Sequence, residues 1–152
     1  MFDYFSMFLS LLTGLFSTLM MTFFEFPFWR KWGLEGVLEW HENQVLYSKF
    51  FRTDRAKINF PGLLFLHFVN GGLGGIGFYF LLTLIPSLIT MMFFVGIVYG
   101  LVLWVLTLLP IHKPITGIDP LKHPLGLGPA ITSLTGHLVY GVILSALMMP
   151  II

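Results

Sequence analysis

Cysteine and charge are what this sequence lacks. The 152-residue chain contains no cysteine, which excludes disulfides, thiolate metal sites, a cysteine nucleophile and CxxC redox pairs. Charged residues make up only 10% of the chain, 57% of it is hydrophobic, and its mean hydropathy is +0.89. Soluble domains carry about 25% charged residues, so this chain could not cover a water-exposed surface. We therefore predict an all-α integral membrane protein.

The few charges nearly cancel, and long stretches of the chain contain no charged residue. Eight basic and seven acidic residues give a net charge of +1, so no nucleic-acid partner is expected. No Asp, Glu, Lys or Arg occurs in 4–24, in 58–112 or after Lys122. These stretches predict the membrane segments.

The stretch 58–112 is too long for one membrane helix. Its 55 residues would extend about 80 Å as a single helix, against about 30 Å of hydrocarbon. Pro86 and Ser87 near its middle predict a turn. We therefore predict four membrane-spanning helices, at residues 4–28, 60–84, 88–109 and 129–149.

The basic residues predict the orientation of these spans. All eight Lys and Arg residues lie in the loops that join the first span to the second and the third to the fourth. Four spans place both loops on one side, and the positive-inside rule makes that side cytoplasmic. We expect a multi-pass cell-membrane protein whose N- and C-termini are extracytoplasmic.

The first loop, 30–59, is long enough to contain its own helix. Apolar residues recur in it at near-helical spacing, and Glu35, Glu39 and Glu42 form an acidic stripe. We predict an amphipathic helix on the cytoplasmic-side interface, with the acidic stripe facing solvent. His41 does not have the spacing to the glutamates that a di-iron carboxylate site requires.

The second loop, 111–128, is rich in proline and glycine and contains His112, Asp119 and His123. Three ligands on one flexible loop are poorly organised for a metal. We therefore expect an ordered docking loop on the cytoplasmic side.

A register comparison indicates an internal repeat. Residues 67–71, His-Phe-Val-Asn-Gly, parallel residues 137–141, His-Leu-Val-Tyr-Gly, 70 positions later. Five residues of the first span match identical residues at the same offset: Thr13, Ser17, Met21, Phe23 and Phe24 with Thr83, Ser87, Met91, Phe93 and Phe94. We predict a duplicated two-helix unit, with parallel copies related by an axis along the membrane normal.

The repeat places two histidines at similar depth. His67 and His137 lie about 10 Å and about 12 Å inside their spans. Glu25 lies near the inner end of the first span, and Asn70 and Tyr140 follow one turn deeper. Ionisable groups within a membrane are costly and suggest function, so these five residues form a candidate intramembrane polar cluster. A purely structural alternative is that each histidine bonds a neighbouring helix and fixes the packing.

Six glycines are candidates for close helix packing, because small residues let helix backbones approach in lipid. They are Gly71, Gly75, Gly96, Gly100, Gly136 and Gly141.

Two resemblances rest on short segments. Residues 67–71, 137–141 and 17–22 (Ser-Thr-Leu-Met-Met-Thr) resemble a loose group of small four-helix prokaryotic membrane proteins of uncharacterised function. That resemblance leaves 30–59 unmatched, and it implies a fold and no activity. Arg52-x-x-Arg55-Ala56-x-x-Asn59 is similar to the entry of the second helix in the membrane-associated eicosanoid and glutathione enzymes. Gly62 stands where that family has glutamate, and no arginine follows Arg55.

These features predict a non-catalytic accessory subunit of a larger membrane complex, such as a membrane copper monooxygenase or a respiratory complex. Its partners would be membrane lipids and other integral membrane subunits. The alternatives are a small proton-coupled transporter using Glu25, His67 and His137, and a membrane enzyme or haem carrier. No cofactor or metal is expected, although the two histidines could ligate haem or a metal ion.

Overall fold

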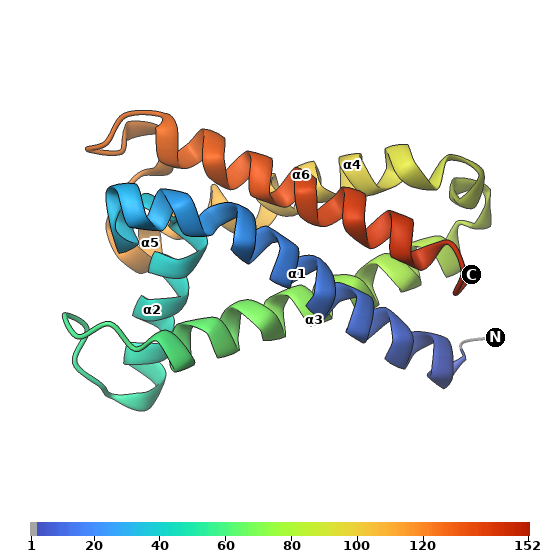
Figure 1. Ribbon diagram of the computed structural model, residues 1–152, viewed down its shortest axis with the longest axis horizontal. Helices are drawn as coiled ribbons and strands as arrows, with labels where there is room; N and C mark the ends of the chain where they lie inside the picture. The colour runs from blue at the N-terminus through green and yellow to red at the C-terminus, as the bar shows by residue number, and fades with distance from the viewer. Residues whose placement is uncertain (1–2) are drawn as a thin grey trace.

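The fold consists of long helices that run side by side (Figure 1). The computed structural model describes residues 3–152, and within that range it contains helices and no strand. The long helices are α1 (Tyr4–Trp32), α3 (Phe60–Leu84), α4 (Met92–Leu103) and α6 (Gly128–Met148). Shorter helical elements connect or extend them: η1 (Leu34–Gly36), α2 (Leu38–Phe51), η2 (Pro86–Met91), the π-helical η3 (Trp104–Leu108), α5 (His112–Thr116) and η4 (Pro120–Lys122).

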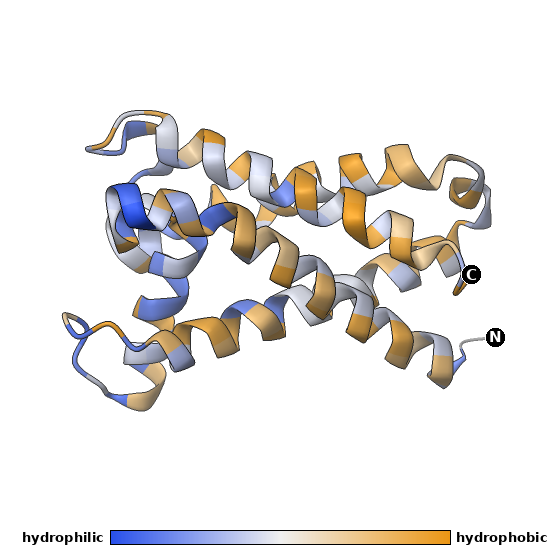
Figure 2. Ribbon diagram, viewed as in Figure 1, coloured by the Kyte–Doolittle hydropathy of each residue, from blue (hydrophilic) through white to orange (hydrophobic). Residues whose placement is uncertain are grey.

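Four helical segments are long and apolar enough to cross a membrane. They are Tyr4–Trp32, Phe60–Leu84, Pro86–Thr116 and Gly128–Met148. This confirms the predicted all-α chain with four membrane-compatible spans. Figure 2 shows hydrophobic residues along the bundle and hydrophilic ones gathered around α2 and its loops. We call the end that carries α2 the loop end. The start of α1 and the end of α6 lie together at the opposite end (Figure 1).

Local signals explain where the spans begin and end. The Asp3 carboxylate caps α1 by accepting bonds from the backbone N–H groups of Phe5 and Ser6. Asn59 caps α3 by accepting from the N–H of Gly62 over 2.9 Å, and α3 ends at the residue before Ile85 and Pro86.

The predicted bounds of two spans are wrong. The first span does not end at residue 28, because α1 continues through Pro27 to Trp32; a proline is tolerated in such helices when neighbours satisfy the freed carbonyl. The third segment is longer at both ends than 88–109 and includes η2 and α5. Residues 112–116 of the predicted second loop are therefore helical.

Glycines allow α1 to cross α3 and α4 to cross α6 at close range. A Cβ at Gly75 would lie 2.8 Å from the Cα of Gly14, and one at Gly71 would overlap Thr18. On the other pair, a Cβ at Gly141 would overlap the carbonyl of Gly96. These contacts place the glycines where backbones touch, as predicted.

The remaining two glycines also sit in tight contacts. A Cβ at Gly100 would overlap the carbonyl of His137, and one at Gly136 would come within 3.1 Å of Glu25 Oε1 and 3.2 Å of Met21. All six predicted positions are thus places where a larger residue would displace a neighbour.

The bundle is less closed on one side. α1 packs against both α3 and α6, whereas α4 and η3 pack against α6 and make few contacts with α3. The lateral space between α3 and the α4–η3 segment is where the candidate site lies.

The first half of α2 is buried in the end of the bundle and does not lie on its surface. Glu39 and Glu42 are only 8% and 9% exposed, and the neighbouring Trp40, Asn43 and Gln44 are more deeply buried. The expected solvent-facing acidic stripe is therefore wrong for two of its three members; Glu35 alone is exposed. Tertiary contacts explain this burial, because each buried carboxylate lies beside a histidine from a helix that is distant in sequence.

The offset of 70 residues does not pair two long helices throughout. Thr13, Ser17 and Met21 lie inside α1, but Thr83 is in the last turn of α3, and Ser87 and Met91 belong to η2. The histidine segments, by contrast, both lie within long helices, α3 and α6.

Candidate functional site

A cavity of about 430 Å³ lies among α2, α3, α4–η3 and α6, towards the loop end of the bundle. Its polar lining comes from Glu39, Glu42, Asn43, His67, Asn70, Tyr99, His137 and Tyr140. Its apolar lining includes Met21, Leu73, Leu103, Leu108 and Ile111. Leu73 is 58% exposed and Ile111 is 40% exposed, so the cavity reaches the lateral surface of the bundle. We call this edge, between α3 and η3, the mouth.

Four of the five predicted cluster residues line this cavity: His67, Asn70, His137 and Tyr140. The fifth, Glu25, is fully buried behind His67, with 3.7 Å between its Oε2 and His67 Nε2. The structure therefore brings the predicted residues together from α1, α3 and α6.

Glu25 is held by α2. The Trp40 indole N–H donates to Glu25 Oε2 over 2.8 Å. Trp40 is buried with Val37 and Leu63 in a small apolar cluster at the loop end. This contact fixes the start of α2 against α1, and it places the adjacent Glu39 beside α6.

Glu39 forms the most fully partnered carboxylate of the site. It accepts a hydrogen bond from the Ser133 hydroxyl, and its Oε1 lies 3.3 Å from His137 Nδ1. That nitrogen also lies 3.0 Å from the Ser133 carbonyl; since both neighbours are acceptors, Nδ1 carries a proton. Burial alone would raise the pKa of Glu39, but His137 and the Ser133 hydroxyl outweigh it and lower the pKa to about 2.

A second acid–imidazole pair lies nearer the loop end. Glu42 Oε2 is 3.4 Å from Nδ1 of His112, which is completely buried. Burial raises the pKa of Glu42, with His112 opposing the shift. The rings of His112 and His41 meet edge to face, with 5.8 Å between centroids. Burial, assisted by the positive charges of His112, Arg55 and His123, lowers the pKa of His41 to about 4.

Hydroxyl and amide bonds hold the helices around the cavity. Tyr140 donates to the Gly71 carbonyl over 2.6 Å, and Tyr99 donates to the Gly74 carbonyl over 2.7 Å. The Asn70 amide donates to Asn43 Oδ1 over 3.2 Å. These bonds tie α6, α4 and α2 to α3.

The backbone of η3 shapes the mouth. η3 is a π-helical turn, a form that is rare and frequent at functional sites. Thr107 and Leu108 of η3 line the cavity, and Thr107 is exposed at the mouth.

Several polar atoms of the lining residues form no hydrogen bond. Among the described residues these are His67 Nε2, Glu39 Oε2 and Glu42 Oε2, all buried, although His67 Nε2 faces Glu25 and Glu42 Oε2 faces His112. Hydrogen bonds from a bound head group would offset the cost of leaving such atoms unsatisfied. The arrangement can therefore accept hydrogen bonds, donate them and exchange protons beside an apolar mouth.

Metal binding has no geometric support in the part of the chain that the structure describes. No group of three or more His, Asp or Glu side chains there is arranged to hold a metal ion. His112, Asp119 and His123 of the second loop turn to different neighbours. Haem at His67 and His137 stays a prediction.

Glu39, Glu42 and Asn43 are site residues that the sequence did not predict, because they lie in a loop between spans. One signal was available. Residues 39, 41, 42, 43 and 44 are all polar and cover every face of a helix, which does not fit an interfacial amphipathic helix.

Comparison with known proteins transfers no function to the chain. No family model, curated protein or solved structure matches it. The resemblance of residues 137–141 to small prokaryotic membrane proteins stays a prediction.

Proposed function

We propose that the protein is a multi-pass cell-membrane protein that binds a small amphipathic molecule in its lateral cavity. The observation that carries this proposal is the cavity itself, which has a wall of Glu, His, Asn and Tyr side chains and an apolar mouth between α3 and η3. Ligand pockets commonly combine a mostly apolar lining with a few polar groups that orient the ligand. We place the loop end in the cytoplasm, following the positive-inside rule.

The side chains favour a neutral hydrogen-bonding head group with an apolar tail. Among the described residues, no Lys or Arg side chain lines the cavity, and His137 already pairs with Glu39, so an anionic head would find no free cation on the polar wall. The tail would leave through the mouth, past Leu73 and Leu103. The ligand would then enter from the bilayer without crossing water.

Asn70 supports the same proposal. It is exposed near the middle of α3, on the cavity wall. Polar side chains in membrane helices almost always face the bundle interior or a cavity. A ligand head group, or a partner helix, would bond the part of this amide that its contact with Asn43 leaves exposed.

Photolabelling tests the proposal. The full-length protein in vesicles is irradiated with a long-chain alcohol that carries a diazirine, and with the matching fatty acid, and the labelled peptides are mapped by mass spectrometry. We expect the alcohol to label α3 and η3 around the mouth more strongly than the acid does. Thr107→Phe, which narrows the mouth, should reduce that labelling.

Leu106→Phe is the matched control, because Leu106 is 65% exposed and does not line the cavity. It should label as the unmodified protein does. Labelling spread evenly over all lipid-facing helices, and equal in both variants, would contradict a binding site.

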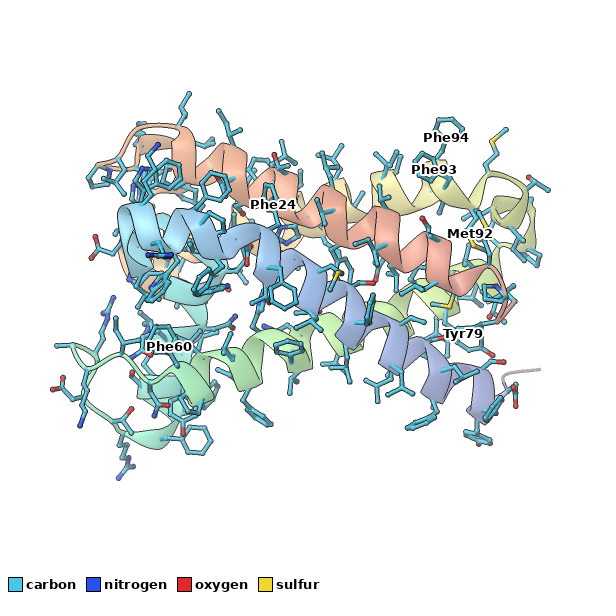
Figure 3. All side chains as sticks on the ribbon, viewed as in Figure 1. Phe24, Phe60, Tyr79, Met92, Phe93 and Phe94 are labelled. Carbon is cyan, nitrogen blue, oxygen red and sulfur yellow. The ribbon has the colours of Figure 1, made fainter. Side chains whose placement is uncertain are left out.

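A second candidate is the accessory subunit expected from the sequence, and the outer face of α4 favours it. Phe93 and Phe94 point away from the bundle (Figure 3), and Phe94 is 67% exposed. α4 has α6 as its main neighbour, so a partner span could pack against the outer face of α4. Co-purification at a fixed ratio with larger membrane subunits would support this role, and purification as a lone monomer would contradict it.

A further inference from the structure

A second pocket, of about 910 Å³, lies at the loop end between α2, the segment after it and α5. Its wall includes Glu35, His41, Gln44, Asp54 and Arg55. Asp54 and Arg55 are exposed, so this pocket opens at the surface of the loop end. We call it the loop-end pocket.

Three side chains, of His41, His112 and Glu42, lie between the loop-end pocket and the lateral cavity. His41 lines the loop-end pocket, and Glu42, the next residue of α2, lines the lateral cavity. His112 is fully buried beside both. It lies 3.4 Å from Glu42 through Nδ1, and its ring centroid is 5.8 Å from that of His41.

Several polar atoms of these residues form no hydrogen bond. Among the described residues, His41 Nδ1, both ring nitrogens of His112 and Glu42 Oε2 are buried without a hydrogen-bond partner. Glu42 Oε2 and His112 Nδ1 face each other at 3.4 Å, which leaves His41 Nδ1 and His112 Nε2 unsatisfied, a cost for a purely structural cluster. Imidazole and carboxyl groups are also the side chains that exchange protons near neutral pH.

We propose that His41, His112 and Glu42 conduct protons between the loop-end pocket and the lateral cavity. The route lets a molecule in the cavity gain or lose a proton from the loop side without water entering through the mouth. Only this last use rests on the proposed ligand-binding function; the route itself depends on the three residues alone.

The transfer balances at each step. A proton from water binds one ring nitrogen of neutral His41, and the proton on its other nitrogen passes to His112. His112 releases its second proton to the Glu42 carboxylate and returns to the neutral form. Glu42 then holds one proton, which it gives to an acceptor in the cavity, so one positive charge moves from the loop-end pocket to the cavity.

Neighbouring charges act on both ends of the route. His41 faces the positive charges of Arg55 and His123 as well as His112, which favour a neutral ring that takes up a proton only in passing. Glu42 faces Glu39, and His137 beyond it. Glu39 favours a protonated Glu42, and the two histidines favour its carboxylate.

Hydrogen–deuterium exchange of the Glu42 carboxyl group tests the route directly. The full-length protein in lipid films is followed by infrared spectroscopy, and the carboxylic C=O band that Glu42→Gln removes is assigned to Glu42. After a switch to heavy water, the shift of this band reports how fast protons reach Glu42. We expect His112→Phe and His41→Phe each to slow the shift at least tenfold.

His123→Phe is the matched control, because His123 is another buried loop-end histidine, 5% exposed, that lies outside the route. Burial lowers the pKa of His123, so at pH 7 its ring is neutral and places no charge near His41. At that pH the variant should exchange at the unmodified rate. His41→Phe changes a residue that borders a pocket, so it keeps the test valid if His112→Phe fails to fold.

Unchanged exchange in folded His112→Phe or His41→Phe would overturn the proposal, as would a Glu42 that shows no protonated band between pH 4 and pH 9. The exchange needs no ligand, so its failure is distinguishable from a failure of photolabelling, which tests the binding function.

Discussion

Glu39 Oε1 on α2 lies 3.3 Å from His137 Nδ1 on α6, two side chains separated by most of the chain. This carboxylate–imidazole pair joins α2 to α6 at the loop end of the bundle. The Ser133 hydroxyl donates a hydrogen bond to the same carboxylate. Both residues also line the lateral cavity. Structure and proposed function therefore depend on the same contact.

Glu39→Gln should destabilise the protein because it removes the charge from a buried pair. We expect the free energy of unfolding to fall by about 3 to 5 kcal/mol, the range for breaking buried ion pairs. Unfolding in detergent micelles measures it. Glu35→Gln is the control, because Glu35 is an exposed member of the same acidic stripe, and it should change little. Equal losses in both variants would contradict the pairing.

Trp40→Phe should leave the buried Glu25 carboxylate without its indole donor, which lies 2.8 Å away. Loss of one partner of a buried hydrogen bond costs about 1 to 3 kcal/mol. The change keeps the aromatic ring, so packing against Val37 and Leu63 is largely retained. Adding Glu25→Gln to Trp40→Phe should then cost less than Glu25→Gln costs alone. Strictly additive losses would show that the two side chains are not coupled.

Gly141→Ala should weaken the crossing of α4 and α6, because its Cβ would overlap the Gly96 carbonyl. We expect a loss of about 1 to 3 kcal/mol, as for other overpacked positions. Val98→Leu enlarges a side chain on the outer face of α4, which is 56% exposed, and should be neutral. A neutral Gly141→Ala would mean that the two backbones are not in contact.

Acidification should destabilise the protein through His41. Its pKa is lowered to about 4 in the folded state, against about 6.5 in an unfolded chain. Between these values the unfolded state binds more protons than the folded state, so stability falls as the pH drops from about 6.5 to 4. Above about pH 6.5 the contribution of His41 to stability does not change with pH. Thermal unfolding at pH 7, 5.5 and 4.5 measures the trend. The slope should be smaller in His41→Gln, and an unchanged slope would contradict the assignment.

Features fixed by local signals were predictable from the sequence. α3 has the predicted bounds, because Asn59 caps its start and Pro86 prevents its continuation. The close-packed glycines were also predictable, since small residues at membrane-helix crossings follow a general rule.

Features that depend on distant partners were not predictable. The burial of Glu39 and Glu42 follows from His137 and His112, which lie far along the chain. The lateral cavity arises because α4 packs mainly against α6 and meets α3 at few residues, an arrangement that hydropathy does not encode. The predicted histidine cluster was found because charge is so scarce in the spans that each ionisable residue stands out.

Native mass spectrometry of the protein, gently extracted from its own membranes, tests the central claim most directly. We predict that a small molecule remains bound at one per chain and is lost from Thr107→Phe but kept by Leu106→Phe. An absorbance spectrum of the same sample identifies any haem at His67 and His137. A protein that carries no small molecule, or one that both variants retain equally, would contradict a binding site in the lateral cavity.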